Sequence, residues 1–257
     1  MGPLVAALTV SHATRADPVD DAYDLAGRIK IPVRAASKQE RDLVGLSAVD
    51  YRDASLKNAG GSSFPSASGV LIDKRLVLTC GHCRGLSSDG KPIVDVLVFA
   101  RDGSEMKGRL ISHSAYKNIE RPRRGGGTDE LHDIGVIHLA ADAPLSPTLR
   151  AAAIDLTVTL EKGDEVLMVG YSKDHQDGSW PHVYSGVVFA LEGGDKNRAI
   201  VIKPNGGIWP GDSGGPAFVR KNGELKLVGV NSQSSQDRSI ATFTLLKPYL
   251  DFIDEHR

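Results

Sequence analysis

The most constraining feature of the sequence is a long series of short apolar runs that starts near Gly60 and is broken repeatedly by Gly, Pro, Asp and Asn. The runs are rich in Val, Ile and Leu, which favour strands, and helical periodicity is scarce. This pattern is typical of an all-β sandwich or barrel. It predicts strands in two sets: 68–72, 75–79, 94–100, 108–113 and 134–139, then 165–171, 183–191, 199–203, 216–220, 225–231 and 240–245.

A proline-punctuated stretch at 143–155 separates the two sets and suits a crossing between two packed units. Two β-barrels of similar size are therefore predicted. The apolar residues of the tail recur at roughly helical spacing, which predicts a short terminal helix packed on the second unit. We expect the following division: 1–16 a candidate signal peptide, 17–60 an N-terminal or pro-segment with the first strand region, 61–147 the first barrel, 148–247 the second barrel and 248–257 the helix.

The signal peptide is inferred from the apolar run 3–10, which is followed by small residues but lacks a preceding Lys or Arg. A signal peptide at this position predicts that the protein is secreted or periplasmic. No run in the sequence is long and apolar enough for a transmembrane helix. The formal net charge is −1, from 31 basic and 32 acidic side chains, so no global positive field exists to bind nucleic acid or an anionic membrane. The basic cluster 121–127 contains a proline and three glycines and is interpreted as a solvated loop.

The stretch GDSGGP at 211–216 carries a serine between glycines. A serine hydroxyl is a poor nucleophile unless a base activates it and preorganised donors stabilise the oxyanion. Glycine on both sides lets the backbone turn sharply and point amide N–H groups at one place. A plain glycine-rich hairpin turn is the alternative interpretation.

Two further stretches supply groups that such a serine needs. An apolar strand ends in TCGHC at 79–83, which is either a dithiol redox motif or a histidine with two cysteine neighbours. Asp133 opens the strongly apolar strand DIGVI and needs a partner if it is drawn inward, because burying an unpaired charge is costly. An imidazole N–H would supply that partner.

Together, TCGHC, DIGVI and GDSGGP resemble the chymotrypsin/trypsin-like serine peptidase family, in its bacterial or fungal form, and they stand in that family's His, Asp, Ser order. The resemblance covers about residue 66 to the C-terminus. It implies two packed six-stranded antiparallel β-barrels, with the site in the cleft between them. It also implies that peptide bonds are hydrolysed through an acyl-enzyme intermediate, with no cofactor.

The resemblance assigns a role to each matched residue. Ser213 is the nucleophile, His82 is the general base that later protonates the leaving amine, and Asp133 orients His82 and stabilises its cation. The backbone N–H groups of Gly211 and Ser213 form the oxyanion hole. Asp212 would pair with a new amino terminus in members activated by cleavage, for which 28–29, 30–31 and 43–45 are only loose candidates here.

The substrate pocket is also assigned by resemblance. The position six before the nucleophile lies at the pocket floor in the family, and here it holds a glycine in place of an aspartate. A preference for a non-basic residue before the scissile bond is therefore expected. The predicted pocket residues are Gly207, Ile208, Asn231, Ser232 and Gln233.

Cys80 and Cys83 are the only cysteines in the chain. In the family, the cysteine after the histidine pairs with an upstream one, but that position falls near Ala67 or Ser68 here. Two small, partly buried thiols acting as packing residues are the preferred expectation. The alternative is a Cys80–Cys83 disulfide beside the imidazole, which would make activity redox-sensitive.

The remaining candidate residues are given structural roles. Asp129 lies among Gly and Thr and is expected to be solvated, while His113, His132 and His138 are interpreted as structural or surface residues. None has a Cys, His or Glu partner at metal spacing, so no metal is predicted.

The leading hypothesis is a monomeric serine endopeptidase that hydrolyses polypeptides. A protein inhibitor is a possible second partner. A peptidase-like binding protein without turnover is the alternative, because a fold does not fix a function, although all three triad members are present. A thiol oxidoreductase using CGHC ranks third, because 84–90 is a poor helix opening and the rest of the chain indicates strands.

Overall fold

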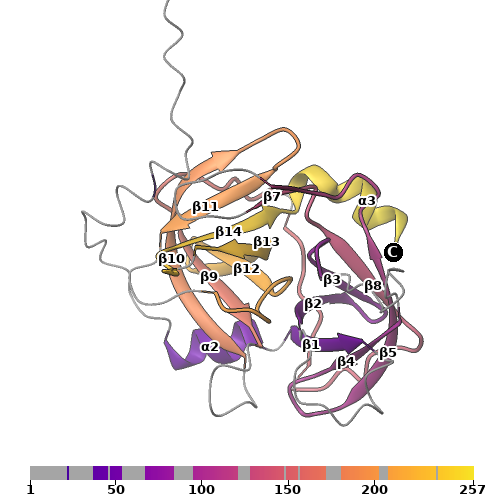
Figure 1. Ribbon diagram of the computed structural model, residues 1–257. Coiled ribbons are helices and arrows are strands. Elements are labelled where there is room, and N and C mark those ends of the chain that lie inside the picture. Colours follow the sequence, from indigo (N-terminus) through magenta and orange to yellow (C-terminus); the bar gives the residue numbers. More distant parts are fainter. Residues whose placement is uncertain are drawn as a thin grey trace, which may run out of the picture.

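The computed structural model describes residues 22, 37–45, 47–53, 67–83, 95–120, 128–147, 149–155, 157–171, 181–202, 208–235 and 237–257. These residues form two closed six-stranded barrels that lie side by side (Figure 1). All neighbouring strands within each barrel are antiparallel. The predicted fold, two packed antiparallel barrels with a short C-terminal helix, is confirmed.

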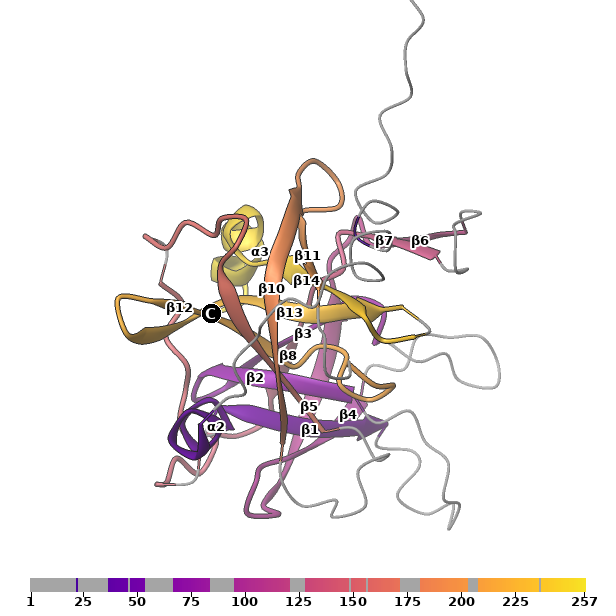
Figure 2. The ribbon, with the colours of Figure 1, turned by 90° about the vertical axis from the view of Figure 1, so that its left-hand side faces the viewer.

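The first barrel has the strand order β1 (Ala48–Asp53), β2 (Ala67–Asp73), β3 (Leu76–Thr79), β8 (Gly135–Leu139), β5 (Glu105–Ser112) and β4 (Asp95–Phe99). The second has the order β10 (His182–Glu192), β11 (Arg198–Ile202), β14 (Ile240–Leu245), β13 (Glu224–Ser234), β12 (Pro216–Lys221) and β9 (Glu165–Gly170). A two-stranded ribbon of β6 (Lys117–Glu120) and β7 (Thr128–Leu131) extends to one side at the level of β11 and β14 of the second barrel (Figure 2). The helical elements are α2 (Lys38–Gly45), η2 (Lys247–Tyr249) and α3 (Leu250–Glu255).

Alternation along the strands builds both the barrel cores and the junction between the barrels. In β3, Val77 packs inside the first barrel, whereas Leu76 and Leu78 point outward into a cluster shared with the second barrel. In β9, Met168 packs inside the second barrel while Val169 joins the same shared cluster. Successive side chains of a strand point to opposite faces, so a continuous apolar run is the pattern expected of a strand buried on both sides.

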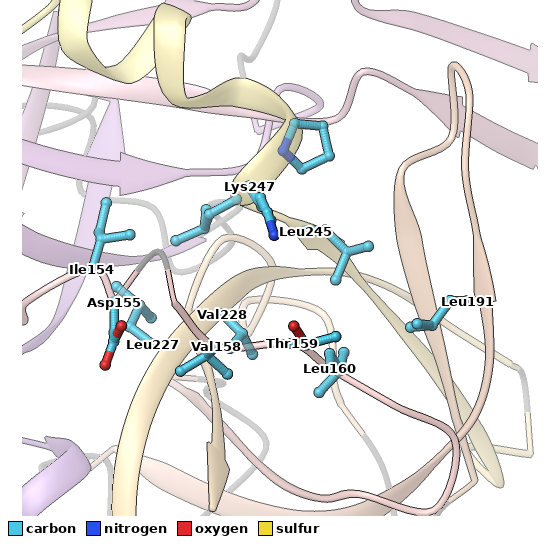
Figure 3. A pocket seen from close by; sticks show the side chains of 12 residues that line it. Ile154, Asp155, Val158, Thr159, Leu160, Leu191, Leu227, Val228, Leu245 and Lys247 are labelled. Atoms are coloured by element: carbon cyan, nitrogen blue, oxygen red, sulfur yellow. The ribbon is translucent and has the colours of Figure 1, made fainter. Parts of the chain in front are cut away.

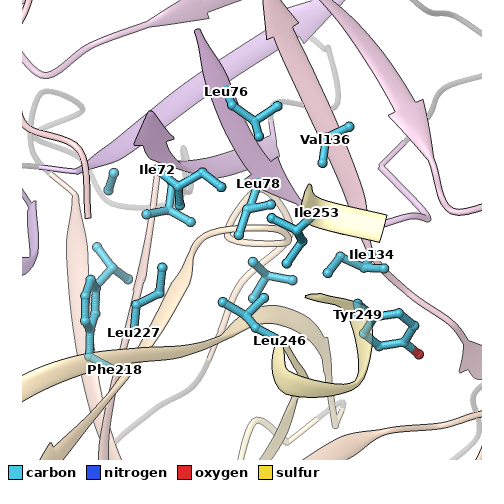
Figure 4. Packing of buried hydrophobic residues seen from close by; sticks show 14 of the residues in the cluster. Ile72, Leu76, Leu78, Ile134, Val136, Phe218, Leu227, Leu246, Tyr249 and Ile253 are labelled. Atoms are coloured by element: carbon cyan, nitrogen blue, oxygen red, sulfur yellow. The ribbon is translucent and has the colours of Figure 1, made fainter. Parts of the chain in front are cut away.

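The C-terminal helix packs at this junction rather than on the second barrel alone, as the sequence had suggested. Ile253 lies close to Leu78 and Ile134 of the first barrel, and Leu246 and Tyr249 complete the cluster (Figure 4). The helix therefore secures the contact between the two barrels.

The N-terminal helix α2 connects to both barrels through its acidic side chains. Glu40 forms an ion pair with Arg220 of β12, and Asp42 lies 3.4 Å from Arg101, which follows β4. One of the loose candidates for an activation site, 43–45, lies within this helix, while 28–29 and 30–31 fall outside the described residues. None of the helices in the described ranges has the length and apolar character needed to cross a membrane.

Candidate active site

Strand pairing brings His82 and Asp133 together. His82 follows β3 and Asp133 precedes β8, and these strands are antiparallel neighbours in which Thr79 pairs with Gly135. Asp133 Oδ2 lies 2.9 Å from His82 Nδ1, and Asp133 Oδ1 accepts a hydrogen bond of 2.8 Å from the backbone N–H of His82. An ionised carboxylate only accepts, so His82 Nδ1 carries the proton and Nε2 keeps a lone pair.

Asp133 also accepts a hydrogen bond from the second barrel. Its side chain is only 1% exposed, and its Oδ2 accepts a hydrogen bond of 2.5 Å from the hydroxyl of Ser232 in β13. The family resemblance places Ser232 in the substrate pocket and does not predict this contact. The sequence shows only that Ser232 is a small hydroxyl residue next to a buried strand residue. This does not identify Asp133 as the group that the hydroxyl contacts.

Opposing effects set the protonation of the pair. Burial alone would lower the pKa of His82, but the negative charge of Asp133 and the hydrogen bond to it outweigh burial and hold that pKa above its usual value. Burial likewise favours a raised pKa for Asp133, but the charge of His82 and the hydrogen bonds from His82 and Ser232 hold it below its usual value. The pair is therefore built to stabilise a positively charged imidazole.

Ser213 lies on a tight turn before β12. Gly211 has φ = 106° and Gly214 has φ = 82°, in the region that glycine adopts at little cost. A Cβ atom on Gly214 would lie 2.1 Å from Thr79 Oγ1 and 2.3 Å from Ser68 O, both in the first barrel. Only glycine lets this turn approach the first barrel so closely.

Polar contacts from Ser68 of β2 fix the turn against the first barrel. The backbone N–H of Ser68 donates to Ser213 O at 2.8 Å, and its hydroxyl donates to Gly211 O at 2.8 Å. The same hydroxyl accepts a hydrogen bond from the N–H of Tyr171. One residue of the first barrel thus fixes two carbonyl groups of the serine turn.

Within the described part of the chain, the backbone N–H groups of Gly211 and Ser213 have no hydrogen-bond acceptor. Asp212, between them, is fully buried and accepts a hydrogen bond of 2.8 Å from the N–H of Trp209 at its Oδ2. The two amides are therefore available to an oxygen atom brought to the turn.

Ser213 Oγ and His82 Nε2 point to different neighbours. Ser213 Oγ donates to Ser232 O at 3.4 Å, whereas His82 Nε2 lies 3.7 Å from Cys80 Sγ. No hydrogen bond joins His82 to Ser213 among the residues that the structure describes. Catalytic hydrogen bonds are often long or misaligned before substrate binds and tighten in the complex.

Cys80 and Cys83 form a disulfide. The preferred expectation of two free thiols is therefore wrong for this structure, and the alternative of a bond beside the imidazole describes it. Cys80 is fully buried, while Cys83 and His82 are partly exposed. The disulfide closes a turn of four residues around His82.

The predicted substrate-pocket residues have varied surroundings. Ile208 packs in the core of the second barrel, and Asn231 Nδ2 donates to Val169 O at 2.8 Å and to Asp212 O at 3.1 Å. Gln233 is partly exposed, and its N–H donates to a threonine hydroxyl in β14. Gly207 lies outside the described residues, so the pocket assignment stays a prediction.

The expectation of a solvated Asp129 is wrong. Asp129 is fully buried on β7, where its Oδ1 lies 3.2 Å from Arg198 of β11 and its Oδ2 lies 3.6 Å from Lys196. His113 and His132 stack with ring centroids 5.3 Å apart next to Tyr249, and His138 meets His256 edge to face, as expected of structural histidines.

Two cavities in the described part of the chain lie away from these residues. One of about 210 Å³ is bounded by β13, β14 and η2 and by the segment 154–160 (Figure 3). A second, of about 430 Å³, lies between α2 and the second barrel. Neither of these two cavities is lined by His82, Asp133 or Ser213.

Comparison with known proteins identifies the class: the chain is a serine-type endopeptidase, a hydrolase. The trypsin family matches residues 47–253 of the sequence. The chain belongs to this family of chymotrypsin/trypsin-like serine peptidases, as its motifs had indicated.

Solved structures with the same fold include two peptidases. Kallikrein-related peptidase 10, in a complex with Zn²⁺, is similar with a TM-score of 0.59 and 19% identity over 87% of this chain and 98% of that chain. A serine endoprotease from Yersinia pestis has a TM-score of 0.59 and 19% identity over 86% of this chain and 67% of that chain. Among curated proteins, no relative matches the sequence.

Proposed function

We propose that the protein hydrolyses peptide bonds through an acyl-enzyme intermediate, with Ser213, His82 and Asp133 as its catalytic triad. The observation that carries the proposal is the buried Asp133 carboxylate, 2.9 Å from His82 Nδ1, which leaves a lone pair on Nε2 to accept a proton. Membership of the trypsin family supports a polypeptide substrate.

The chemistry follows from these groups. Ser213 Oγ attacks the scissile carbonyl carbon while His82 Nε2 takes the hydroxyl proton, and the imidazolium is stabilised by Asp133. The N–H groups of Gly211 and Ser213 stabilise the oxyanion, each contributing roughly 3 kcal/mol in the transition state. His82 then protonates the leaving amine, and a water molecule activated by His82 hydrolyses the acyl-enzyme.

Substrate preference and location complete the proposal. The glycine at 207 supports an uncharged residue before the scissile bond, because no carboxylate is available at that position to pair with Lys or Arg. We expect kcat/KM for peptides with Leu or Phe there to exceed that for Lys by about tenfold or more, which a fluorogenic peptide series measures. The apolar N-terminal run supports export, with the mature enzyme acting as a monomer and open to a protein inhibitor.

The proposal is tested by labelling the purified chain with a fluorophosphonate, which reacts with activated serines. Wild type should be labelled, Ser213→Ala should not, and Ser234→Ala, which removes an exposed hydroxyl from the end of β13, should behave as wild type. Sequencing the amino terminus of the labelled species shows whether processing is required. Absence of labelling in the wild type, before and after limited proteolysis, would favour a binding protein that keeps the fold without turnover.

A further inference from the structure

Three potential metal ligands, one of them from the proposed general base, lie close together. Cys80 Sγ, Cys83 Sγ and a ring nitrogen of His82 lie within 4.8 Å of one another. The distance from Cys80 Sγ to His82 Nε2 is 3.7 Å. Two ligands of a tetrahedral zinc ion, at ~2.3 Å for sulfur and ~2.0 Å for nitrogen, are separated by ~3.6 Å. The distance between Cys80 Sγ and His82 Nε2 is therefore already close to the separation of two ligand atoms on one zinc ion.

The sequence spacing and the surroundings of His82 fit the same use. Two residues separate Cys80 from Cys83, a spacing that recurs in zinc sites. Histidine ligands of metals usually donate their other N–H to a carboxylate, which fixes the ring and raises its basicity. His82 donates Nδ1–H to Asp133 in this way and directs Nε2 toward the sulfurs.

We propose that reduction of the Cys80–Cys83 disulfide creates a Zn²⁺ site, with both thiolates and His82 Nε2 as ligands, and that the bound metal switches the peptidase off. The metal is assigned as Zn²⁺ because it favours thiolate and imidazole ligands in tetrahedral geometry. Solvent supplies the fourth ligand, since His82 is 25% exposed. The claim that zinc inhibits the peptidase rests on the proposed function, whereas the claim that zinc binds does not.

The redox step uses a dithiol as reductant. Its thiolate attacks the Sγ atom of Cys83, the more exposed of the two cysteines, forms a mixed disulfide and releases Cys80 as a thiolate. The second thiol of the reductant then displaces Cys83 and leaves as a cyclic disulfide, so two electrons and two protons pass to the protein. Zn²⁺ binding replaces the two thiol protons, which are released to solvent.

Inhibition follows from the shared nitrogen. His82 Nε2 has a single lone pair, which either coordinates the metal or accepts the proton of Ser213. With zinc bound, Ser213 loses its base. Removal of the metal restores the free imidazole. Exchange with a small-molecule disulfide, which takes up two electrons and two protons and leaves as two thiols, returns the two cysteines to their disulfide.

The binding experiment uses the full chain with Ser213→Ala, so that its result does not depend on catalysis. The protein is reduced with a dithiol, freed of reductant without oxygen and titrated with Zn²⁺ against a chromophoric chelator. We expect one Zn²⁺ per chain, bound at least ~100-fold more tightly than by the oxidised protein, and a similar loss for Cys80→Ser or Cys83→Ser. Co²⁺ in place of Zn²⁺ should give thiolate-to-metal charge-transfer absorption, a readout that requires sulfur ligands.

Several results would overturn the site. One is equal zinc affinity before and after reduction, and another is unchanged affinity in the serine variants. A third is failure of the folded chain to release two titratable thiols. His113→Ala serves as the control for binding at the stacked histidine pair and should leave the stoichiometry unchanged.

A second arm separates this inference from the proposed function. Fluorophosphonate labelling of the wild type should be lost only when the protein is reduced and Zn²⁺ is added, and a chelator should restore it. Labelling that persists with zinc bound would refute inhibition and leave the peptidase proposal intact. No labelling in any state, together with reduction-dependent zinc binding, would refute the peptidase proposal and leave the metal site intact.

Discussion

At the residue scale, Asp133 keeps its charge in the interior because its donors are fixed. The backbone N–H and Nδ1–H of His82 and the hydroxyl of Ser232 all point at its two oxygens. Removing a partner from a buried charge usually costs more than the interaction itself contributes, because the remaining group stays desolvated. Asp133 and His82 are therefore coupled, and a change in one shifts the protonation of the other.

The pH dependence of activity follows from the raised pKa of His82. In the proposed mechanism His82 is the general base and must be neutral, so kcat/KM should fall as pH drops through a value above the ordinary ~6.5 of histidine. Asp133→Asn removes the charge that raises the pKa, so the acidic limb should move to lower pH while kcat falls by about 10⁴-fold. Rate profiles and NMR titration of the His82 ring measure both effects. A titration of His82 that is the same in Asp133→Asn as in wild type would contradict this account.

Gly214 provides a second prediction, because the same backbone angle occurs at a control position. Gly214 and Gly223 both have φ = 82°, but a Cβ on Gly223 would meet no atom within 4 Å. Gly223→Ala should cost about 1–2 kcal/mol from the backbone alone. Gly214→Ala should cost more and should abolish labelling of Ser213, because its Cβ collides with the first barrel. Urea unfolding of both variants measures the difference, and equal losses would refute the role assigned to the close approach.

At the element scale, the sequence indicated most strands but not their polar partners. Every predicted run overlaps a strand, because strands buried on both faces are rich in Val, Ile and Leu. Three strands, β1, β6 and β7, carry charged residues and have no apolar run, so no run predicts them; of these, only β1 lies in a segment, 17–60, for which a first strand region was expected. Periodicity records which positions are apolar, and it contains no information about which distant strand supplies a counter-charge.

The same limit applies to individual site residues. The motifs placed His82, Asp133 and Ser213 on neighbouring elements, but the contact from Ser232 to Asp133 depends on how the two barrels dock. Asp129 was assigned to a solvated loop because its neighbours are Gly and Thr, whereas its burial is explained by Arg198 on a strand of the other barrel. Local composition cannot show such pairs.

The buried ion cluster gives the prediction at this scale. Arg198 is 2% exposed and contacts both Asp129 and Glu192. Arg198→Met should destabilise the protein by about 3 kcal/mol or more, because both carboxylates lose a buried cation. Adding Asp129→Asn should recover part of the loss, since it removes a buried negative charge that has lost one of its two cations and keeps only Lys196 at 3.6 Å. Unfolding curves of the single and double variants give the coupling, and strictly additive losses would contradict it.

At the scale of the whole molecule, the site exists only where the barrels meet. His82 and Asp133 come from the first barrel and Ser213 and Ser232 from the second, and outward-facing residues of both form the cluster at the junction. The C-terminal helix inserts Ile253 into this cluster (Figure 4). The stability of the junction and the geometry of the site should therefore change together.

Shortening a buried side chain of the C-terminal helix tests whether junction stability and site geometry change together. Ile253→Ala should lower the free energy of unfolding by about 2–5 kcal/mol, because it removes a fully buried side chain from packed surroundings. It should also slow fluorophosphonate labelling, since the barrels are less firmly docked. Asp254→Ala, which changes an exposed side chain of the same helix, is the matched control. A destabilised Ile253→Ala variant that is labelled at the wild-type rate would separate junction packing from site geometry.

The position of Ser68 has a consequence for when proteolytic capacity arises during synthesis. Ser68 belongs to the first barrel, yet it binds the carbonyl groups of Gly211 and Ser213 in the second. Translation produces the first barrel before the nucleophile, and Ile253, which seals the junction, follows every residue of the site in the chain. If the proposed triad carries out catalysis, a growing chain should therefore gain proteolytic activity only after its C-terminal helix has been made and has docked at the junction.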